Sequence, residues 1–291
     1  MGEFSSVSDV RERLASTGYL ADEAIATTVF LSDRLGKPLL VEGPAGVGKT
    51  ELAKAVAQAT GAGLVRLQCY EGLDEARALY EWNYKKQLLR IQASGDDAAW
   101  DEVHDDVFSA EFLLDRPLLT AIRRDEPTVL LVDETDKADV EVEGLLLEVL
   151  SDFQVTIPEL GTITARRRPF VVLTSNATRE LSEALKRRCL YLHLGYPTPQ
   201  REKEIVLARA PEAAERLVEQ VVRAVAAMRG LELRKPPSIA ETIDWARTLI
   251  ALGKDELDAE TAQGTLGAVL KHAVDQERAV RELALAEGPP G

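Results

Sequence analysis

The chain has 291 residues, of which 45% are hydrophobic, and a formal net charge of −14. Its length allows about two domains, and its apolar content is enough for a sizeable core, which excludes global disorder. The acidic balance argues against a broad nucleic-acid-binding surface, because such surfaces are normally basic, so we expect no nucleic-acid partner.

Cysteine and histidine usage gives no sign of a metal centre. Cys69 and Cys189 lack CxxC spacing and indicate buried, reduced thiols. The histidines lie far apart in the chain, so we infer no transition-metal site: His104, His193 and His272. The polar start of the chain is unlike a secretory leader, and apolar runs such as 128–132 are strand-sized. We therefore expect a soluble, cytoplasmic protein with no membrane span.

Residues 1–36 form a predicted helical segment that packs on the core, with helical spacing from residue 8 and a stop at Gly36. Tyr19 and Leu20 lie in its middle. Such apolar residues ahead of a nucleotide-binding motif either cover the sheet or line a pocket for the base, and the pattern leaves both interpretations open.

Residues 39–60 read as a strand, a glycine-rich loop and a helix. The loop has the spacing GxxxxGKT, which places flexible backbone where N–H groups must turn inward around phosphate oxygens. Lys49 adds a charge for the outer phosphates, and the Thr50 hydroxyl is suited to bind Mg²⁺. Glycine-rich turns without a ligand also occur, but this context favours binding of a nucleoside triphosphate. The predicted contacts are Gly43, Pro44, Ala45, Gly46, Val47, Gly48, Lys49, Thr50 and Glu51.

Between the loop helix and residue 123 the pattern is mixed. Residues 64–67 alternate like a short strand, and 70–92 are rich in helix formers. The aromatic cluster in this stretch is either core or an exposed contact surface, and we favour core: Tyr80, Trp82 and Tyr84. Residues 95–106 are strongly acidic, which indicates a solvated loop or a partner contact rather than a calcium site. Residues 108–114 return to helical spacing, and Pro117 begins a further predicted helix.

A second strong motif spans 128–134. Its apolar residues predict a strand buried on both faces, as parallel strands are. The strand ends in Asp133 and Glu134, at the sheet edge where an open α/β fold places its ligands. Asp133 is suited to hold Mg²⁺ through water, and Glu134 to orient and deprotonate an attacking water.

Residues 141–196 predict a helix, a hairpin over 153–165, and a core strand that ends at Asn176. The Asn176 amide can hydrogen-bond a water or the terminal phosphate. A short helix then ends in the basic pair Arg187 and Arg188; by itself such a pair often only offsets the helix dipole.

From residue 199 the sequence predicts helices only, over 200–210, 212–228, 238–251 and 259–286. The expected fold class is therefore α/β: a P-loop NTPase parallel sheet sandwiched by helices, followed by a small all-helical lid domain. We place the ATPase core at 37–196, the lid at 197–287 and a tail at 288–291.

These motifs together resemble an AAA+ ATPase over about residues 20–250. Within that superfamily the chain is similar to the MoxR branch, and within it to the CoxD-like group linked to maturation of the molybdenum–copper carbon monoxide dehydrogenase. The segments that carry the resemblance are PLLVEGP at 38–44, YEWNYKKQLL at 80–89, FLLDRPLL at 112–119 and VDETDK at 132–137.

The resemblance implies roles for individual residues. Residues 43–50 match Walker A, Asp133 and Glu134 match Walker B, and Asn176 matches sensor 1. Arg188 matches best the arginine finger that reaches a neighbour's nucleotide, with Arg187 second. The sensor 2 position falls near Pro236-Pro237, where Arg234 or Lys235 would have to substitute. Two further segments match insertions of the family: the hairpin at 153–165 and the aromatic stretch at 80–92.

The resemblance also implies ATP/ADP and Mg²⁺ as ligands and a homo-oligomeric, hexameric ring. It further implies hydrolysis at subunit interfaces that remodels a client metalloenzyme. A partner with a von Willebrand factor A domain is often involved. Alternatives are a rubisco- or nitric-oxide-reductase-activating ATPase of the same branch, a DNA-handling AAA+ motor, which the net charge disfavours, and a nucleotide-binding switch, which Glu134 argues against.

Overall fold

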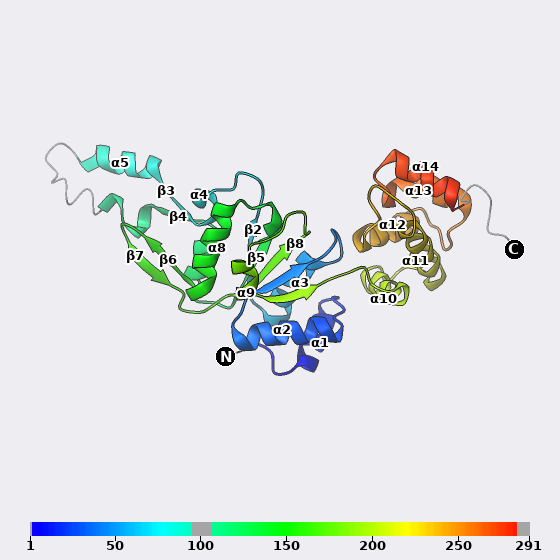
Figure 1. Ribbon diagram of the computed structural model, residues 1–291, viewed down its shortest axis with the longest axis horizontal. Helices are drawn as coiled ribbons and strands as arrows, with labels where there is room; N and C mark the ends of the chain where they lie inside the picture. The colour runs from blue at the N-terminus through cyan, green and yellow to red at the C-terminus, as the bar shows by residue number, and fades with distance from the viewer. Residues whose placement is uncertain (1, 95–105, 284–291) are drawn as a thin grey trace. The chain divides into compact units, whose positions relative to one another are not determined.

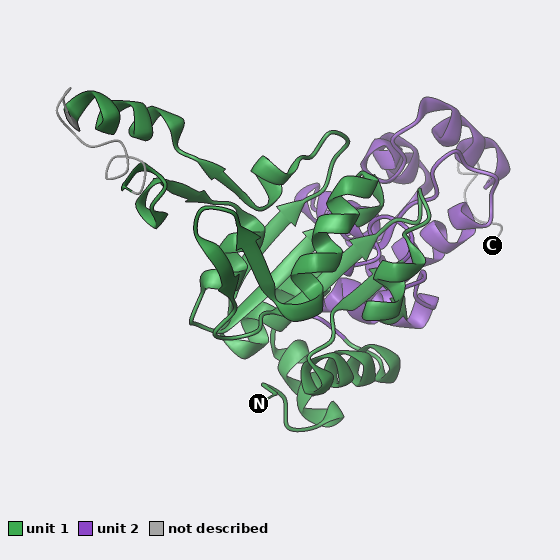
Figure 2. Ribbon diagram, turned by 60° about the vertical axis from the view of Figure 1, so that its left-hand side comes forward, with its two compact units in different colours: residues 1–17, 21–42, 50–193 green, residues 18–20, 43–49, 194–291 purple. Residues whose placement is uncertain are grey.

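The computed structural model describes residues 2–94 and 106–283 and forms two compact units (Figures 1 and 2). The sheet unit comprises residues up to 17, 21–42 and 50–193; the helical unit comprises 18–20, 43–49 and 194 onward. The predicted acidic run at 95–106 lies outside the described residues except for Asp106. Contacts therefore group the loop 43–49 with the helical part of the chain.

The sheet unit is built on a parallel five-stranded sheet in the order β2-β5-β8-β1-β9, which confirms the predicted fold class. Since all strands are parallel, their carboxyl ends lie at one edge, where Gln68 pairs with Asp133 and Glu42 with Ser175. The strands are β1 (Leu39–Glu42), β2 (Gly63–Gln68), β5 (Thr128–Asp133), β8 (Phe170–Ser175) and β9 (Leu190–His193).

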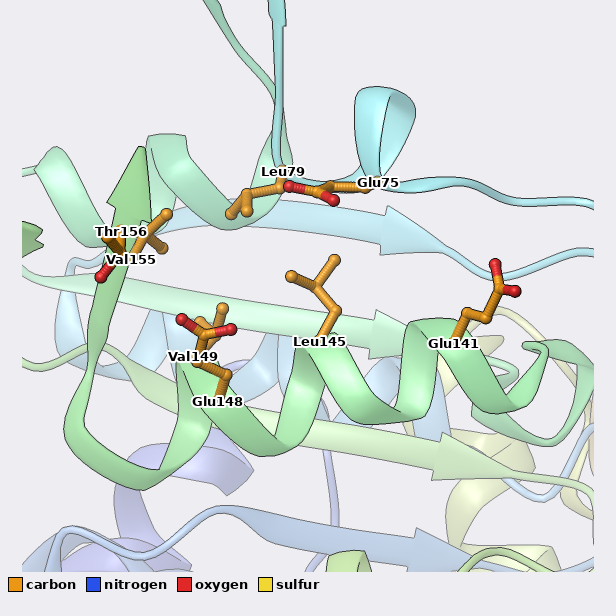
Figure 3. A pocket seen from close by; sticks show the side chains of 8 residues that line it. All are labelled: Glu75, Leu79, Glu141, Leu145, Glu148, Val149, Val155 and Thr156. Carbon is orange, nitrogen blue, oxygen red and sulfur yellow. The ribbon is translucent and has the colours of Figure 1, made fainter. Parts of the chain in front are cut away.

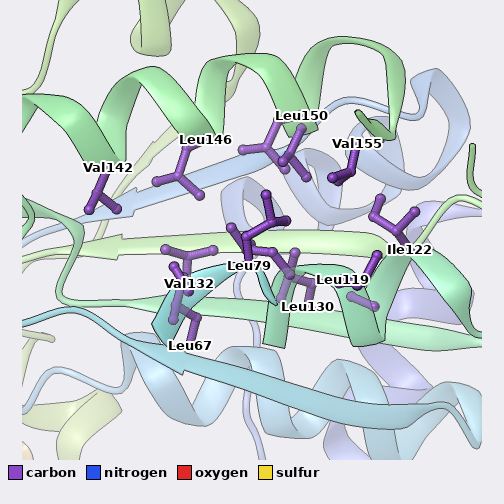
Figure 4. Close-up of a cluster of buried hydrophobic side chains, with 14 of the residues drawn as sticks. Leu67, Leu79, Leu119, Ile122, Leu130, Val132, Val142, Leu146, Leu150 and Val155 are labelled. Atoms are coloured by element: carbon purple, nitrogen blue, oxygen red, sulfur yellow. The ribbon is translucent and has the colours of Figure 1, made fainter. Parts of the chain in front are cut away.

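Helices cover the sheet and supply its core. Strand β5, which lies between β2 and β8, is buried at every position, and Figure 4 shows Val142, Leu146 and Leu150 pointing from α8 toward Leu130 and Val132 of that strand. Helix α7 contributes to the same core, while α2 contacts β1 and β9. The helices of this unit are α1 (Val7–Ser16), α2 (Glu23–Leu35), α3 (Lys49–Thr60), α7 (Pro117–Arg123), α8 (Val140–Asp152) and α9 (Glu183–Arg188).

A small antiparallel ribbon replaces two predicted helical stretches. Strand β3 (Tyr80–Trp82) pairs with β4 (Leu113–Asp115), so the helical prediction over 108–114 is wrong at its end. The chain forms strands rather than a helix there because Trp82 lies opposite Leu113 in the ribbon and both side chains are buried. The ribbon is flanked by α4 (Glu75–Ala78), α5 (Tyr84–Ser94) and the short helix η1 (Ala110–Phe112).

The predicted aromatic core cluster is only partly buried. Trp82 is 8% exposed and meets Phe108 edge to face at 5.3 Å, whereas Tyr84 is 61% exposed. Trp82 belongs to the ribbon, whereas Tyr84 lies beyond it as the first residue of α5. The predicted hairpin is confirmed: β6 (Gln154–Ile157) pairs with β7 (Gly161–Thr164).

The helical unit contains α10 (Pro199–Arg209), α11 (Glu215–Arg229), α12 (Ile239–Ala251), α13 (Ala259–Val269) and α14 (Ala273–Glu282). The single helix predicted over 259–286 is wrong, because Leu270 is extended (φ −115°, ψ 120°) and separates α13 from α14. The break lets Leu270 bury its side chain, and it directs Asp275 toward the backbone N–H groups of Arg234 and Lys235. Within the described residues, none of the helices combines the length and apolar character needed to cross a membrane.

Candidate active site

Asp133 is the centre of a hydrogen-bonded cluster at the carboxyl edge of the sheet. Its carboxylate is 3% exposed. Oδ1 accepts from Thr50 Oγ1 at 3.0 Å and from Thr174 Oγ1 at 2.5 Å, while Oδ2 accepts from Arg66 at 2.5 Å. The structure thus brings together Thr50 and Asp133, the two residues predicted to hold Mg²⁺. A hydroxyl beside a fixed carboxylate is a set of hard oxygen donors, which is the chemistry that Mg²⁺ prefers.

Glu134 follows in a left-handed backbone conformation, with φ 56° and ψ 48°. This conformation is costly for a residue other than glycine and often occurs at functional sites. Its N–H donates to Thr174 Oγ1 at 2.9 Å, which fixes the turn. Among the described residues its carboxylate accepts only at Oε2, from Gln68 Nε2 at 2.9 Å and from Lys137 Nζ at 2.6 Å. The predicted base is therefore held at the sheet edge by two donors.

Asn176 lies directly after β8, the strand between β5 and β1. Its N–H donates to Asp136 Oδ1 at 3.1 Å, and Thr178 donates to Asp136 Oδ2 from both its N–H, at 3.0 Å, and its hydroxyl. Burial by itself raises the pKa of the Asp136 carboxyl, but these hydrogen bonds outweigh it and lower the pKa below 3.8. Asp136 is consequently an anion that fixes the backbone around Asn176.

The loop 43–49 has a conformation that only glycine tolerates at several positions. Gly46 and Gly48 have φ of 74° and 100°, and a Cβ on Gly46 would lie 2.3 Å from Ser238 Oγ. Lys49 donates from Nζ to the carbonyls of Gly43 and Pro44, at 2.7 Å each. Along the chain the loop directly follows β1 and directly precedes Thr50, the residue that donates to Asp133. Left-handed glycines, a lysine within the loop and the Thr50–Asp133 pair fit a magnesium-bound nucleoside triphosphate.

The other predicted nucleotide contacts differ in their surroundings. A Cβ on Gly48 would lie 3.7 Å from the Tyr19 ring, so the Tyr19 side chain lies beside the loop. Leu20 is the next residue of the chain and belongs to the same unit. Glu51 forms an ion pair with Lys54, with 2.7 Å between Glu51 Oε1 and Lys54 Nζ. Arg234 is exposed and is held by its backbone N–H. From that segment of the chain, Ser238 and Ala240 contact Gly46, the latter through N–H to O at 3.4 Å.

The two predicted finger residues lie at the carboxyl end of α9, and both are exposed. Arg188 donates from Nε to Ser151 Oγ on α8 at 2.7 Å and from NH1 to the Ala184 carbonyl at 3.1 Å. These are neutral acceptors, so the guanidinium charge is not neutralised by a carboxylate in the described contacts. An exposed arginine of this kind is suited to act on a neighbouring subunit.

Sequence reasoning missed Arg66, Gln68 and Thr174. Each lies at or near the carboxyl end of a strand next to β5, and that position was the one signal that could have found them. Their contribution is to hold Asp133 and Glu134 in place.

A glycine-rich loop between the first strand and its helix, with a threonine bound to the acid at the end of a buried parallel strand, defines a P-loop NTPase. The family model for the AAA domain of the dynein-related subfamily matches residues 38–189. The chain belongs to this family and is an AAA+ ATPase.

Relatives of known name agree with this classification. The chain is 26% identical over 235 residues to the denitrification regulatory protein NirQ of Pseudomonas aeruginosa, covering 78% of this chain and 81% of NirQ. It is 30% identical over 138 residues to the ATP-binding subunit ClpL of an ATP-dependent Clp protease from Lactococcus lactis, but spans only 16% of that protein. A RuvB mutant of Thermotoga maritima shares the fold, with a TM-score of 0.52, 18% identity, and coverage of 99% of this chain and 80% of RuvB.

Proposed function

We propose that this protein is an ATP-hydrolysing remodelling chaperone of the MoxR branch, acting as a cytoplasmic homo-oligomeric ring. The observation that carries the proposal is the cluster in which Asp133 accepts from Thr50 while Glu134, the next residue, is held at the same sheet edge. A P-loop with both acids supports hydrolysis rather than binding alone. We retain 37–196 as the ATPase core and 197–287 as the lid.

Each residue has a defined part in the proposed hydrolysis. The loop N–H groups and Lys49 bind the outer phosphates, and Lys49 exchanges the carbonyls of Gly43 and Pro44 for phosphate oxygens. Thr50 and Asp133 would hold Mg²⁺, which would supply positive charge beside the phosphates. Tyr19 and Leu20 contact the base.

Glu134 acts as the base that orients and deprotonates water. Both donors to its carboxylate bind Oε2, so Oε1 is the oxygen proposed to accept the water proton. Asn176 then orients the same water or the terminal phosphate, on a backbone that Asp136 fixes.

We further propose that Arg188, with Arg187 as the second candidate, acts in trans on a neighbour's nucleotide in a hexameric ring. Its exposure and its neutral acceptors support this role. An arginine supplied in this way typically contributes ~10³–10⁵ in rate, so an isolated subunit would be nearly inactive. Arg234 remains the candidate for sensing the phosphates from the lid.

The proposed client is a metalloenzyme whose cofactor must be inserted or activated, such as molybdenum–copper carbon monoxide dehydrogenase, with a von Willebrand factor A partner. The similarity to NirQ favours a second candidate, the regulation of a denitrification enzyme such as nitric oxide reductase. The likeness to RuvB concerns the fold alone, and the net charge of −14 disfavours DNA as the substrate.

The test is ATP turnover per subunit across a range of protein concentrations. We expect turnover to rise with concentration, to be lost in Glu134→Gln with nucleotide binding retained, and to fall by ~10³ in Arg188→Ala. Arg166→Ala is the control, because Arg166 is also an exposed arginine but pairs with the carboxylate of Asp125. A flat, low rate that does not depend on Arg188 would contradict the ring mechanism and leave a nucleotide switch.

A further inference from the structure

A groove of about 220 Å³ lies on the sheet unit (Figure 3), and none of the residues that line it belongs to the candidate active site. It is formed by α4, α8 and β6, and its floor is aliphatic, with Leu79, Val149 and Val155 buried and Leu145 partly buried. The volume is below the usual range for small-molecule and cofactor sites. A groove of this size and lining is suited to aliphatic side chains of a protein partner.

Three carboxylates surround this floor: Glu75, Glu141 and Glu148. All three are exposed, and none forms an ion pair or hydrogen bond through its side chain in the described part of the chain. Figure 3 shows Glu141, Leu145 and Glu148 along one side of α8, pointing toward α4. The complementary surface must therefore bring a cation next to apolar side chains.

Helix α5 carries such a surface. Tyr84, Leu88 and Leu89 are 61%, 60% and 67% exposed, and Ile91 is 41% exposed. Lys85 is exposed among them and forms no ion pair within the described residues. An apolar helix face that stays in water is unusual for a monomer and marks a contact site. We call the face formed by these five residues the α5 face.

The opposite side of α5 is anchored within its own subunit. Gln87 donates to the Val107 carbonyl at 2.8 Å, and Lys86 pairs with Glu111 at 2.7 Å. In Figures 1 and 2 the helix extends from the β3–β4 ribbon away from α8. With one side bonded in this way, the α5 face is exposed to solvent and makes no contact with the groove of its own chain among the described hydrogen bonds and ion pairs.

We propose that the α5 face of one subunit docks in the Glu75–Glu141–Glu148 groove of a second copy of this chain. Leucines of α5 cover the floor, and Lys85 meets the acidic rim. Each subunit carries both surfaces, the α5 face and the acidic groove, at different places. The interface is therefore heterologous, and its repetition in one direction forms a ring or a filament. The inference deepens the proposed ring, but it does not require hydrolysis.

Cross-linking tests the contact directly in the full-length chain. Leu88→Cys and Glu148→Cys chains are mixed as dilute monomers, concentrated with and without Mg²⁺ and a non-hydrolysable ATP analogue, and treated with a short bismaleimide. Burial raises the pKa of both native thiols, Cys69 and Cys189, to about 12, so they stay protonated and unreactive. The unaltered chain and a mixture of Leu252→Cys with Glu148→Cys are the controls, since Leu252 is 57% exposed but lies outside both surfaces.

We expect a cross-linked dimer only when Leu88→Cys and Glu148→Cys are mixed. A dimer from Leu88→Cys alone would overturn the proposal, because α5 would then pair with itself. Assembly by sedimentation without the mixed cross-link would overturn this interface and leave the proposed ATPase ring standing. A chain that stays monomeric with and without nucleotide would overturn both.

Charge exchange provides a second readout that does not depend on cross-linking. Lys85→Glu and Glu148→Lys should each raise the concentration of half-assembly about threefold, as expected for one exposed ion pair, and the double variant should restore it. Leu89→Asp should raise it by ~10-fold or more, because it places a charge against the apolar floor. Unchanged assembly in all four variants would contradict the proposal.

Discussion

The carboxylate of Asp136 accepts the backbone N–H of Asn176 at 3.1 Å, so the turn after β8 is fixed by the segment that follows β5. Thr178 donates to the same carboxylate, and Ala177 between them has a left-handed backbone with φ 56°. The end of β8 is therefore shaped by an anion two residues beyond Glu134. This coupling makes the position of Asn176 depend on Asp136.

Replacing Asp136 by Asn should disturb this coupling with little change in volume. The amide can accept at one atom only, so at least one backbone N–H loses its partner, and hydrogen bonds to a charged group contribute about 1.5–3 kcal/mol. We expect a loss of about 2 kcal/mol in the free energy of unfolding, and lower ATP turnover with nucleotide binding retained. Asp139→Asn is the control, because that exposed carboxylate accepts only one long bond from Gly72, at 3.4 Å.

The same carboxylate predicts an acid-sensitive stability. The pKa of Asp136 is lowered below 3.8 in the folded state, so the unfolded state binds its proton more tightly. The ionised Asp136 carboxylate contributes fully to the free energy of unfolding above its pKa in the unfolded state. That contribution is lost as the pH falls through its pKa in the folded state. Denaturant unfolding at about pH 3 to 6 should show stability falling with acid, and Asp136→Asn should reduce that slope. An identical slope in the variant would contradict this assignment.

Two further carboxylates add to the acid sensitivity. Burial raises the pKa of Glu143, but hydrogen bonds from Ser182 and Arg179 lower it below 4.5. The pKa of Glu241 is likewise lowered by Ser238 despite burial. Since both folded pKa values lie below the unfolded ones, the slope that remains in Asp136→Asn should have the same sign.

Gln68 restrains the proposed base. Its Nε2 donates to Glu134 Oε2 at 2.9 Å, and removing one such bond, about 1 kcal/mol, frees the carboxylate to rotate toward water. We expect Gln68→Leu to raise the turnover of ATP by up to about fivefold. Steady-state turnover at saturating ATP measures it, and Arg66→Met serves as the contrasting variant, because Arg66 donates to Asp133 and to the Gln68 Oε1 atom but not to Glu134. Lower turnover in Gln68→Leu would show that Gln68 positions the base rather than restraining it.

The loop and the acid strand could be predicted from the sequence because each motif is local. Lys49, Thr50, Asp133 and Glu134 lie in short runs whose spacing reflects one turn or one strand end. Their partners could not be predicted in this way. Thr174 meets Asp133 only because β8 is inserted between β5 and β1, and that order is set by packing of the whole sheet.

Two errors have a common physical origin. The sequence favours a core position for the aromatic cluster at 80–84, yet Tyr84 is exposed on α5, because a sequence pattern shows a face and not what covers it. Likewise the pattern over 259–286 continues through Leu270, where the chain leaves the helix to bury that side chain. Both the exposure of a side chain and the end of a helix depend on tertiary packing, which a local sequence pattern does not show.

The Gly46 position should tolerate no side chain. A Cβ there would lie 2.3 Å from Ser238 Oγ, in addition to the cost of φ 74°, whereas Gly253 has a similar φ of 68° with nothing within 4 Å. We expect Gly253→Ala to lose only about 1–2 kcal/mol of unfolding free energy, and Gly46→Ala to lose more and to weaken nucleotide binding. Thermal unfolding and a fluorescent ATP analogue measure the two effects. Equal losses in both variants would indicate that the conformation alone, and not contact with Ser238, requires glycine.

Finally, a buried ion pair should hold the helical unit together. Glu202 is fully buried and accepts from Arg229 at 2.6 and 2.8 Å and from Thr242 at 2.7 Å. Arg229 also donates to the Pro237 carbonyl at 2.7 Å and lies 4.6 Å from the Tyr196 ring. The pair thereby fixes the chain directly before Ser238.

Glu202→Ala leaves the Arg229 charge buried without its partner, which typically costs about 3–5 kcal/mol. Glu202→Leu combined with Arg229→Met should recover most of that loss, because both charges are then removed together and the volume is largely kept. Nucleotide affinity gives an independent readout: since Arg229 holds Pro237 and Ser238 contacts Gly46, we expect it to fall in Glu202→Ala even at temperatures where the protein stays folded. If the double variant were no more stable than Glu202→Ala, the loss would come from packing and the Thr242 hydrogen bond rather than from an unpaired charge.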